Sequence, residues 1–136
     1  MMRKIYFSVS LVLILVIMDR ISKDVARASG HYLTNSGISF GLLSGFNELI
    51  TLISIIALII FAMLIYINKG TYLLYNIGLL MMLSGTLGNL LDRLLIGKVI
   101  DFINIGLFHF PIFNFSDAYL SIGLIIIFIQ TIRGKD

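Results

Sequence analysis

Two aspartates, Asp101 and Asp117, lie on either side of a phenylalanine-rich stretch between the last two long apolar segments of the chain. A carboxylate at the depth of a lipid bilayer is costly, so a pair of them there calls for a functional reason. Two carboxyl groups that share a site can differ in pKa and divide the acid and base roles on one water molecule. The pair therefore predicts the chemistry of an aspartic peptidase.

The composition predicts an integral membrane protein. Of the 136 residues, 59% are hydrophobic and 12% are charged, whereas soluble domains are about 45–50% apolar. Four apolar segments can each cross about 30 Å of hydrocarbon as a helix once their flanks are included. We expect an all-α membrane protein with four transmembrane helices and a small extended or looped element on the outer face. The spans expected within one domain, residues 1–136, are approximately 5–24, 48–67, 72–92 and 115–133.

Missing residue types narrow the chemistry further. The chain has no cysteine, which excludes disulfides, thiolate metal sites and a cysteine nucleophile. His31 and His109 stand alone in the sequence, so we expect no metal site and no cofactor. The sequence has no run of basic residues that would indicate a nucleic-acid partner. The segment after Arg3 and Lys4 resembles a signal peptide, but Asp19 follows where a cleavage site would lie, so we expect a retained anchor.

Charged residues divide unevenly between the two ends of the predicted bundle. Four spans place both termini on one side of the membrane, together with a single acid, Asp136. The opposite end holds the other six acids, which are Asp19, Asp24, Glu48, Asp92, Asp101 and Asp117. Lysine and arginine divide equally, but only those at the terminal end are plain flanking anchors. We therefore place both termini in the cytoplasm and a site at the outer, acidic end.

Further polar clusters fall at this acidic end. Asp19 and Lys23 are four residues apart, so they share a helix face and can pair, either as a structural ion pair or to shape a site. Residues 35–46 hold three glycines and no charge, which indicates an extended or looped element. That element is either a turn-rich connection or a surface that a peptide backbone can approach.

The third apolar segment carries Gly85, Gly88, Asn89 and Asp92 on one helical stripe, with Arg93 beside it. Helix packing in lipid explains the glycines. Packing does not explain the three polar residues together, so we interpret them as a hydrogen-bonding network that supports the site.

The stretch between the two aspartates contains five phenylalanines and is too short to cross the membrane and return. We expect it to lie in the membrane interface, anchored by its aromatic rings. Ser116 or Asp117 could instead serve only as the N-cap of the last helix. A cap would leave Asp101 and Asn114 unexplained.

The polar blocks, in this order, resemble those of lipoprotein signal peptidase, the bacterial type II signal peptidase. The blocks are Asp19-x-x-Ser22-Lys23, Asn35-x-Gly37-x-x-Phe40, Gly85-x-x-Gly88-Asn89-x-x-Asp92-Arg93, Val99-Ile100-Asp101-Phe102 and Phe113-Asn114-x-x-Asp117. Each block alone is weakly specific. Five of them in register on four spans, over most of the chain, are highly specific.

The resemblance implies an aspartic endopeptidase of the bacterial cytoplasmic (inner) membrane, with its site near the outer face. It implies removal of the signal peptide from diacylglyceryl-modified prolipoproteins, just before the lipidated cysteine, without a metal. The other partners it implies are membrane lipid and inhibitory globomycin-type cyclic peptides, and we expect a monomer. The matching catalytic residues are Asp101 and Asp117, and those that bind substrate or support the site are Asp19, Lys23, Asn35, Gly37, Asn89, Arg93 and Asn114.

In the expected mechanism one aspartate is ionised and takes a proton from water, while the other is protonated and polarises the scissile carbonyl. The sequence does not assign these two roles. A transporter is a competing hypothesis, but it predicts polar residues along the depth of the bundle, and the span 48–67 is almost entirely apolar. Two further hypotheses are a non-catalytic scaffold and a presenilin-like protease. The Gly-x-Gly-Asp block that is typical of the latter is absent at both aspartates.

Overall fold

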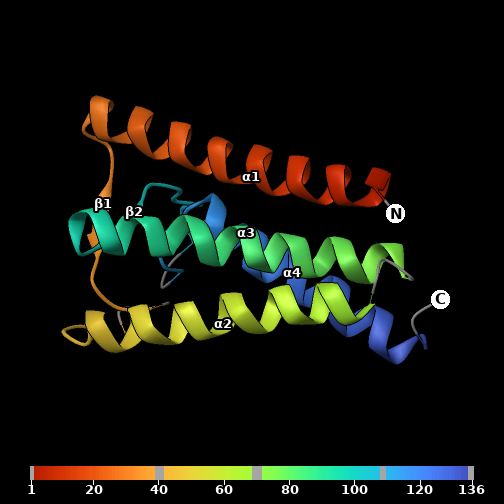
Figure 1. Cartoon of the computed structure of the whole chain (residues 1–136). Helices are drawn as coiled ribbons and strands as arrows, with labels where there is room; N and C mark the ends of the chain where they lie inside the picture. Colours follow the sequence, from red (N-terminus) through yellow and green to blue (C-terminus); the bar gives the residue numbers. More distant parts are fainter. Residues whose placement is uncertain (1, 39–41, 69–71, 108–109, 135–136) are drawn as a thin grey trace.

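The protein is a bundle of four long helices with a two-stranded sheet at one end, in a computed structural model that describes residues 2–38, 42–68, 72–107 and 110–134 (Figure 1). The elements are α1 (Met2–Ser29), β1 (Leu33–Asn35), α2 (Asn47–Asn68), α3 (Leu73–Ile96), β2 (Val99–Asp101) and α4 (Phe115–Ile132). All four helices are long and apolar enough to cross a membrane. The predicted fold class is therefore confirmed. Phe40 of the second polar block, the isolated His109 and the terminal acid Asp136 lie outside the described residues.

Helix α3 is the centre of the bundle, because α1, α2 and α4 all pack against it. Figure 1 shows it between α1 and α2, with α4 behind. In the most apolar 18-residue stretch of α3, 56% of the residues are buried inside the protein. The corresponding share is 22% for α4 and 6% for each of α1 and α2. The outward side chains of the other helices are largely apolar, as expected for helices whose solvent is lipid.

Glycines allow α3 and α4 to approach closely. A Cβ atom at Gly78 would lie 2.9 Å from the carbonyl oxygen of Gly123, and one at Gly123 would lie 2.6 Å from the carbonyl oxygen of Gly78. Larger residues would force the two backbones apart. Near the strand end, a Cβ atom at Gly88 would collide with the Ser116 hydroxyl and the Asp19 carboxylate. The glycine stripe therefore lets polar groups from three helices meet.

A left-handed turn after α3 directs the chain into the sheet. Gly97 ends α3 with φ of 73°, and its N–H donates to the Arg93 carbonyl at 3.0 Å. Strand β2 then pairs antiparallel with β1 in the register Leu33–Asp101, Thr34–Ile100 and Asn35–Val99. An isolated bridge between Ile103 and Phe113 follows, so the two ends of the phenylalanine-rich stretch lie together. This arrangement brings Asp101 next to the start of α4.

The described residues of the expected range 35–46 that follow Asn35 form bends and turns, which agrees with a looped element, and the structure adds a short strand before them. Strand β1 ends at Asn35, and its partner β2 is a segment for which the sequence analysis predicted no strand. Val99 and Ile100 of β2 are both almost completely buried. The segment therefore lacks the alternation of apolar and polar residues from which a strand is predicted. Two short segments far apart in sequence thus form the sheet only because the helices bring them together.

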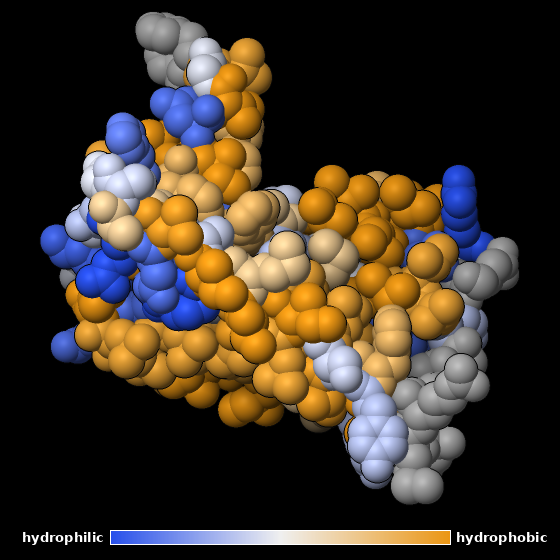
Figure 2. All heavy atoms as spheres, turned by 90° about the horizontal axis from the view of Figure 1, so that it is seen from above, coloured by the Kyte–Doolittle hydropathy of each residue, from blue (hydrophilic) through white to orange (hydrophobic). Residues whose placement is uncertain are grey.

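Polar and apolar residues separate along the bundle axis. Helix α1 begins and α4 ends at the end opposite the strands (Figure 1). Hydrophilic residues gather at the strand end, and hydrophobic residues cover the middle of the molecule (Figure 2). This distribution of polar residues indicates that a site lies at the strand end.

Candidate active site

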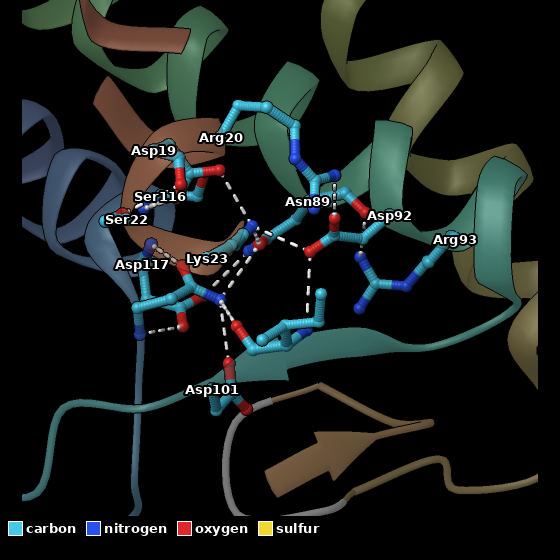
Figure 3. A network of polar contacts seen from close by, with 12 residues as sticks. Asp19, Arg20, Ser22, Lys23, Asn89, Asp92, Arg93, Asp101, Ser116 and Asp117 are labelled. Atoms are coloured by element: carbon cyan, nitrogen blue, oxygen red, sulfur yellow. Dashed lines mark hydrogen bonds and ion pairs between the residues drawn. The ribbon is translucent and has the colours of Figure 1, made fainter. Parts of the chain in front are cut away.

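A buried charge cluster around Lys23 joins α1 to α3 at the strand end (Figure 3). The Lys23 Nζ atom lies 2.8 Å from Asp19 Oδ2 and 2.8 Å from Asp92 Oδ2, and all three side chains are at most 2% exposed. The ion pair predicted between Asp19 and Lys23 is confirmed, and Asp92 is a second partner from α3. Arg20 donates to Asp92 Oδ1 at 2.8 Å. Two cations thus neutralise the two buried carboxylates.

Asn89 of α3 connects this cluster to α4. Its Oδ1 atom accepts hydrogen bonds from Lys23 Nζ and from Asn114 Nδ2, both at 3.1 Å. Because its oxygen faces an ammonium group, its amide nitrogen must be the donor on the other side. That nitrogen donates to Asp117 Oδ1 at 2.8 Å. Lys23 therefore determines which way Asn89 presents its amide to Asp117.

Asp117 is held by the N-terminal cap of α4. Its backbone N–H donates to Asn114 Oδ1 at 3.0 Å, and the Asn114 N–H donates to Asp117 Oδ2 at 3.1 Å. This is a capping box with Asn114 as the N-cap, so the hypothesis that Ser116 or Asp117 is the cap is wrong. Each Asp117 oxygen accepts one hydrogen bond at a helix N-terminus, where negative charge is favourable.

Asp101 ends β2 beside this cap and is only 4% exposed. Its Oδ1 accepts from Asn114 Nδ2 at 2.7 Å, and its Oδ2 accepts from Asn35 Nδ2 at 3.2 Å. Burial and the negative charge of Asp117 raise the pKa of Asp101 to about 6, although the hydrogen bonds from Asn35 and Asn114 act in the opposite direction. Asp101 can therefore hold or release a proton near neutral pH.

Arg93 ties α3 to the segment that follows β1. Its Nη2 donates to the Gly37 carbonyl at 2.8 Å, so the third helix is linked directly to the loop after β1. The Gly37 N–H donates to Asn35 Oδ1 at 2.8 Å. With its oxygen engaged in this way, Asn35 directs its amide nitrogen at Asp101.

A cavity of about 360 Å³ opens over the two aspartates. Its polar wall consists of Asn35, Asn89, Arg93, Asp101 and Asp117. Its other walls are mainly apolar and include Ile38, Val99, Phe110, Pro111, Ile112, Phe113, Ala118 and Ile122. The cavity is thus suited to an apolar chain held next to two carboxyl groups. In the part of the chain that the structure describes, no group of three or more His, Cys, Asp or Glu residues could hold a metal ion.

The candidate residues fall into two layers. Seven of them, Asn35, Gly37, Asn89, Arg93, Asn114, Asp101 and Asp117, surround the cavity or contact its carboxylates. Asp19 and Lys23 do not line the cavity and act on it through Asn89 and through the backbone N–H of Ser116, which donates to Asp19 Oδ1 at 2.9 Å.

Sequence reasoning missed the roles of Arg20 and of two backbone groups. Arg20 pairs with Asp24 at 2.9 Å as well as with Asp92, and its spacing of four residues from Asp24 could have indicated it. The Ser116 N–H and the Ile100 carbonyl, which accepts from Asn114 Nδ2 at 3.2 Å, leave no signal in a sequence because every residue other than proline carries both of these groups.

Comparisons with known proteins agree with one another. Residues 11–133 match the family described as signal peptidase (SPase) II. The chain is 43% identical over 101 residues to the lipoprotein signal peptidase of Lactiplantibacillus plantarum, with 74% of this chain and 67% of that protein covered. It is 35% identical over 156 aligned positions to that of Staphylococcus aureus (strain bovine RF122 / ET3-1), with 97% and 93% covered. A solved bacterial membrane enzyme superposes with a TM-score of 0.85 at 31% identity, with 95% of this chain and 89% of that chain covered.

The substitution Lys23→Met should strongly destabilise the fold, because Asp19 and Asp92 would stay buried without their shared ammonium group. Removal of one partner from a buried ion pair costs about 3–5 kcal/mol. Thermal unfolding in detergent, followed by circular dichroism, measures this loss. Lys98→Met removes an exposed lysine at the same end and should change the unfolding free energy by no more than about 0.5 kcal/mol. Equal midpoints for the two variants would contradict the role given to Lys23.

Proposed function

The chain belongs to the signal peptidase II family, and from this premise we propose that it is an aspartic endopeptidase with Asp101 and Asp117 as its catalytic pair. It is a peptidase that removes signal peptides from prolipoproteins. This family membership sets aside the transporter and scaffold hypotheses.

One observation carries the aspartic assignment. Asn114 contacts both carboxyl groups, with its side-chain amide on Asp101 at 2.7 Å and its backbone N–H on Asp117 at 3.1 Å. A single residue thus holds the two carboxyl groups next to each other at the wall of the cavity. Two carboxyl groups that close titrate as a coupled pair and tend to share one proton.

The surroundings support a division of roles. Asp101, with its raised pKa of about 6, is the proton donor to the scissile carbonyl oxygen. Asp117 accepts hydrogen bonds from Asn89 and Asn114 and is the ionised base. Asp117 takes a proton from water, whose oxygen attacks the carbonyl carbon while Asp101 protonates the carbonyl oxygen. Asp117 then gives that proton to the leaving amine as the C–N bond breaks, and Asp101 regains its own from the collapsing intermediate.

The proposal extends to the substrate and its approach. The peptide bond cut lies just before a diacylglyceryl-modified cysteine, whose lipid chains stay in the bilayer. The cavity reaches along the first turns of α4 to Ser121 and Ile122, so an apolar chain can arrive from the membrane side. Globomycin-type cyclic peptides would compete for this cavity, and the enzyme would act as a monomer without a cofactor.

The catalytic pair is tested by Asp101→Asn and Asp117→Asn. Each should reduce cleavage of a lipidated prolipoprotein in detergent by about 10²-fold or more, because asparagine keeps the shape and loses the proton transfer. Asp24→Asn is the matched control, since Asp24 is an exposed acid on α1 that does not line the cavity. Retained activity in either Asp101→Asn or Asp117→Asn would refute the assignment of the catalytic pair. A loss on chelation that zinc restores would indicate a metallopeptidase instead.

The acid role of Asp101 predicts how activity depends on pH. In the free enzyme kcat/KM should fall as pH rises through about 6, where Asp101 loses its proton. Asn35→Ala removes a hydrogen bond that stabilises the ionised carboxylate, so the pKa should rise and the alkaline limb should move to higher pH. Asn104→Ala, at an exposed position after β2, should leave the limb in place. If the alkaline limb of the kcat/KM profile keeps its pH or shifts to lower pH in Asn35→Ala, the acid is a group other than Asp101.

We also propose that the strand end faces outwards and that both termini lie in the cytoplasm, as the separation of acids from flanking cations indicates. The chain has no cysteine, so single cysteines can report the orientation. Asn104→Cys should react with a membrane-impermeant maleimide in intact spheroplasts, whereas Arg133→Cys should react only after the membrane is permeabilised. The opposite pattern would invert the topology.

A further inference from the structure

A second cavity, of about 280 Å³, meets the first one at Asp101. It is lined by Leu33, Thr34, Asn35, Ser36, Ser44, Asp101 and Ile112. Three of these residues, Asn35, Asp101 and Ile112, also line the first cavity. Asp101 therefore stands at the boundary between two spaces, and a chain that crosses Asp101 would occupy both.

The two cavities differ in position along the bundle axis. The first includes residues of α3 and α4, down to Ile122 within the span of α4. Among the residues that the structure describes, none from the four helices lines the second, whose walls come from the two strands and from the segments that precede α2 and α4. The second cavity thus lies beside the loops, beyond the ends of the four apolar helices.

The two cavities also differ in chemistry. The wall of the first is mainly apolar apart from its polar patch. The second has Ser36, Ser44 and the amide of Asn35 in its lining, beside the apolar side chains of Leu33 and Ile112. A small space that holds hydroxyl and amide groups accommodates small or polar side chains and peptide groups better than large apolar ones.

The sheet provides a common wall for a chain in this cavity. Leu33 is paired with Asp101, and directly paired residues project from the same face of a sheet. Asn35, two residues along β1, projects from that face as well. Leu33 is 58% exposed, so it stands at the edge of the cavity and its size controls the space next to Asp101.

We propose that the second cavity receives the first residues of the mature lipoprotein, those that follow the lipidated cysteine, and favours small or polar side chains there. The inference rests on the proposed function. The signal peptide and the lipid arrive from the bilayer and fit the apolar first cavity, whereas the mature chain continues into water. The segments on either side of the scissile bond therefore match the cavities on either side of Asp101.

The test compares three lipidated substrates that differ only after the cysteine. One ends at the cysteine as an amide, one continues with serine residues, and one has tryptophan directly after the cysteine. Leu33→Trp should reduce the ratio of kcat/KM for the serine substrate over the truncated one by about tenfold. Leu33→Ala should improve cleavage of the tryptophan substrate severalfold relative to the serine substrate. Leu42→Trp is the matched control, since Leu42 is 61% exposed and lines neither cavity.

Each outcome either supports the proposal or overturns it. An equal loss on truncated and extended substrates in Leu33→Trp would overturn the proposal and make the second cavity part of the dyad's own environment. An unchanged ratio of kcat/KM for the tryptophan substrate over the serine substrate in Leu33→Ala would also overturn it. Failure of the proposed function is distinguishable, because the dyad variants would then keep cleaving all three substrates.

Discussion

The site depends on the ion pairs that the ammonium group of Lys23 makes with Asp19 and Asp92. This ammonium group lies between a carboxylate of its own helix and one of α3, with all three groups shielded from solvent. Such charges are costly at membrane depth unless they are paired and hydrogen-bonded. Asp19 in turn accepts the backbone N–H of Ser116 at the start of α4. One cation thus holds together the ends of three helices, and those ends carry the site.

The two pairs of aspartates in this region have different partners. Asp19 and Asp92 are paired with Lys23 and Arg20, and these ion pairs join α1 to α3. Among the described residues no ion pair within 4.0 Å involves Asp101 or Asp117, whose hydrogen bonds come from asparagine amides and backbone N–H groups. An amide N–H orients a carboxylate and favours its ionised form less strongly than a paired cation does. The network therefore fixes the position of the dyad and leaves its proton mobile.

The two aspartates of the proposed catalytic pair are held by different kinds of element, one by a helix and the other by the sheet. Asp117 sits in the first turn of a spanning helix, and Asp101 sits on a short strand outside the spans. The strand is held by its pairing with β1 and by the Ile100 N–H, which donates to Asp92 Oδ2 at 3.3 Å. The proposed catalytic pair thus joins the first turn of a helix long and apolar enough to cross a membrane to a strand outside the four such helices.

The four spans, the polar end and the ion pair between Asp19 and Lys23 could all be predicted from the sequence alone. These depend on segment length, hydropathy and a four-residue helical spacing, which are local properties. Three other features depend on how the chain folds: Asp92 is the second partner of Lys23, Asn114 and not Asp117 caps α4, and β1 pairs with β2. Three-residue strands carry too little local preference to predict their pairing. Those contacts join segments far apart in the chain, and they form because glycine-mediated packing around α3 brings the ends of the helices together.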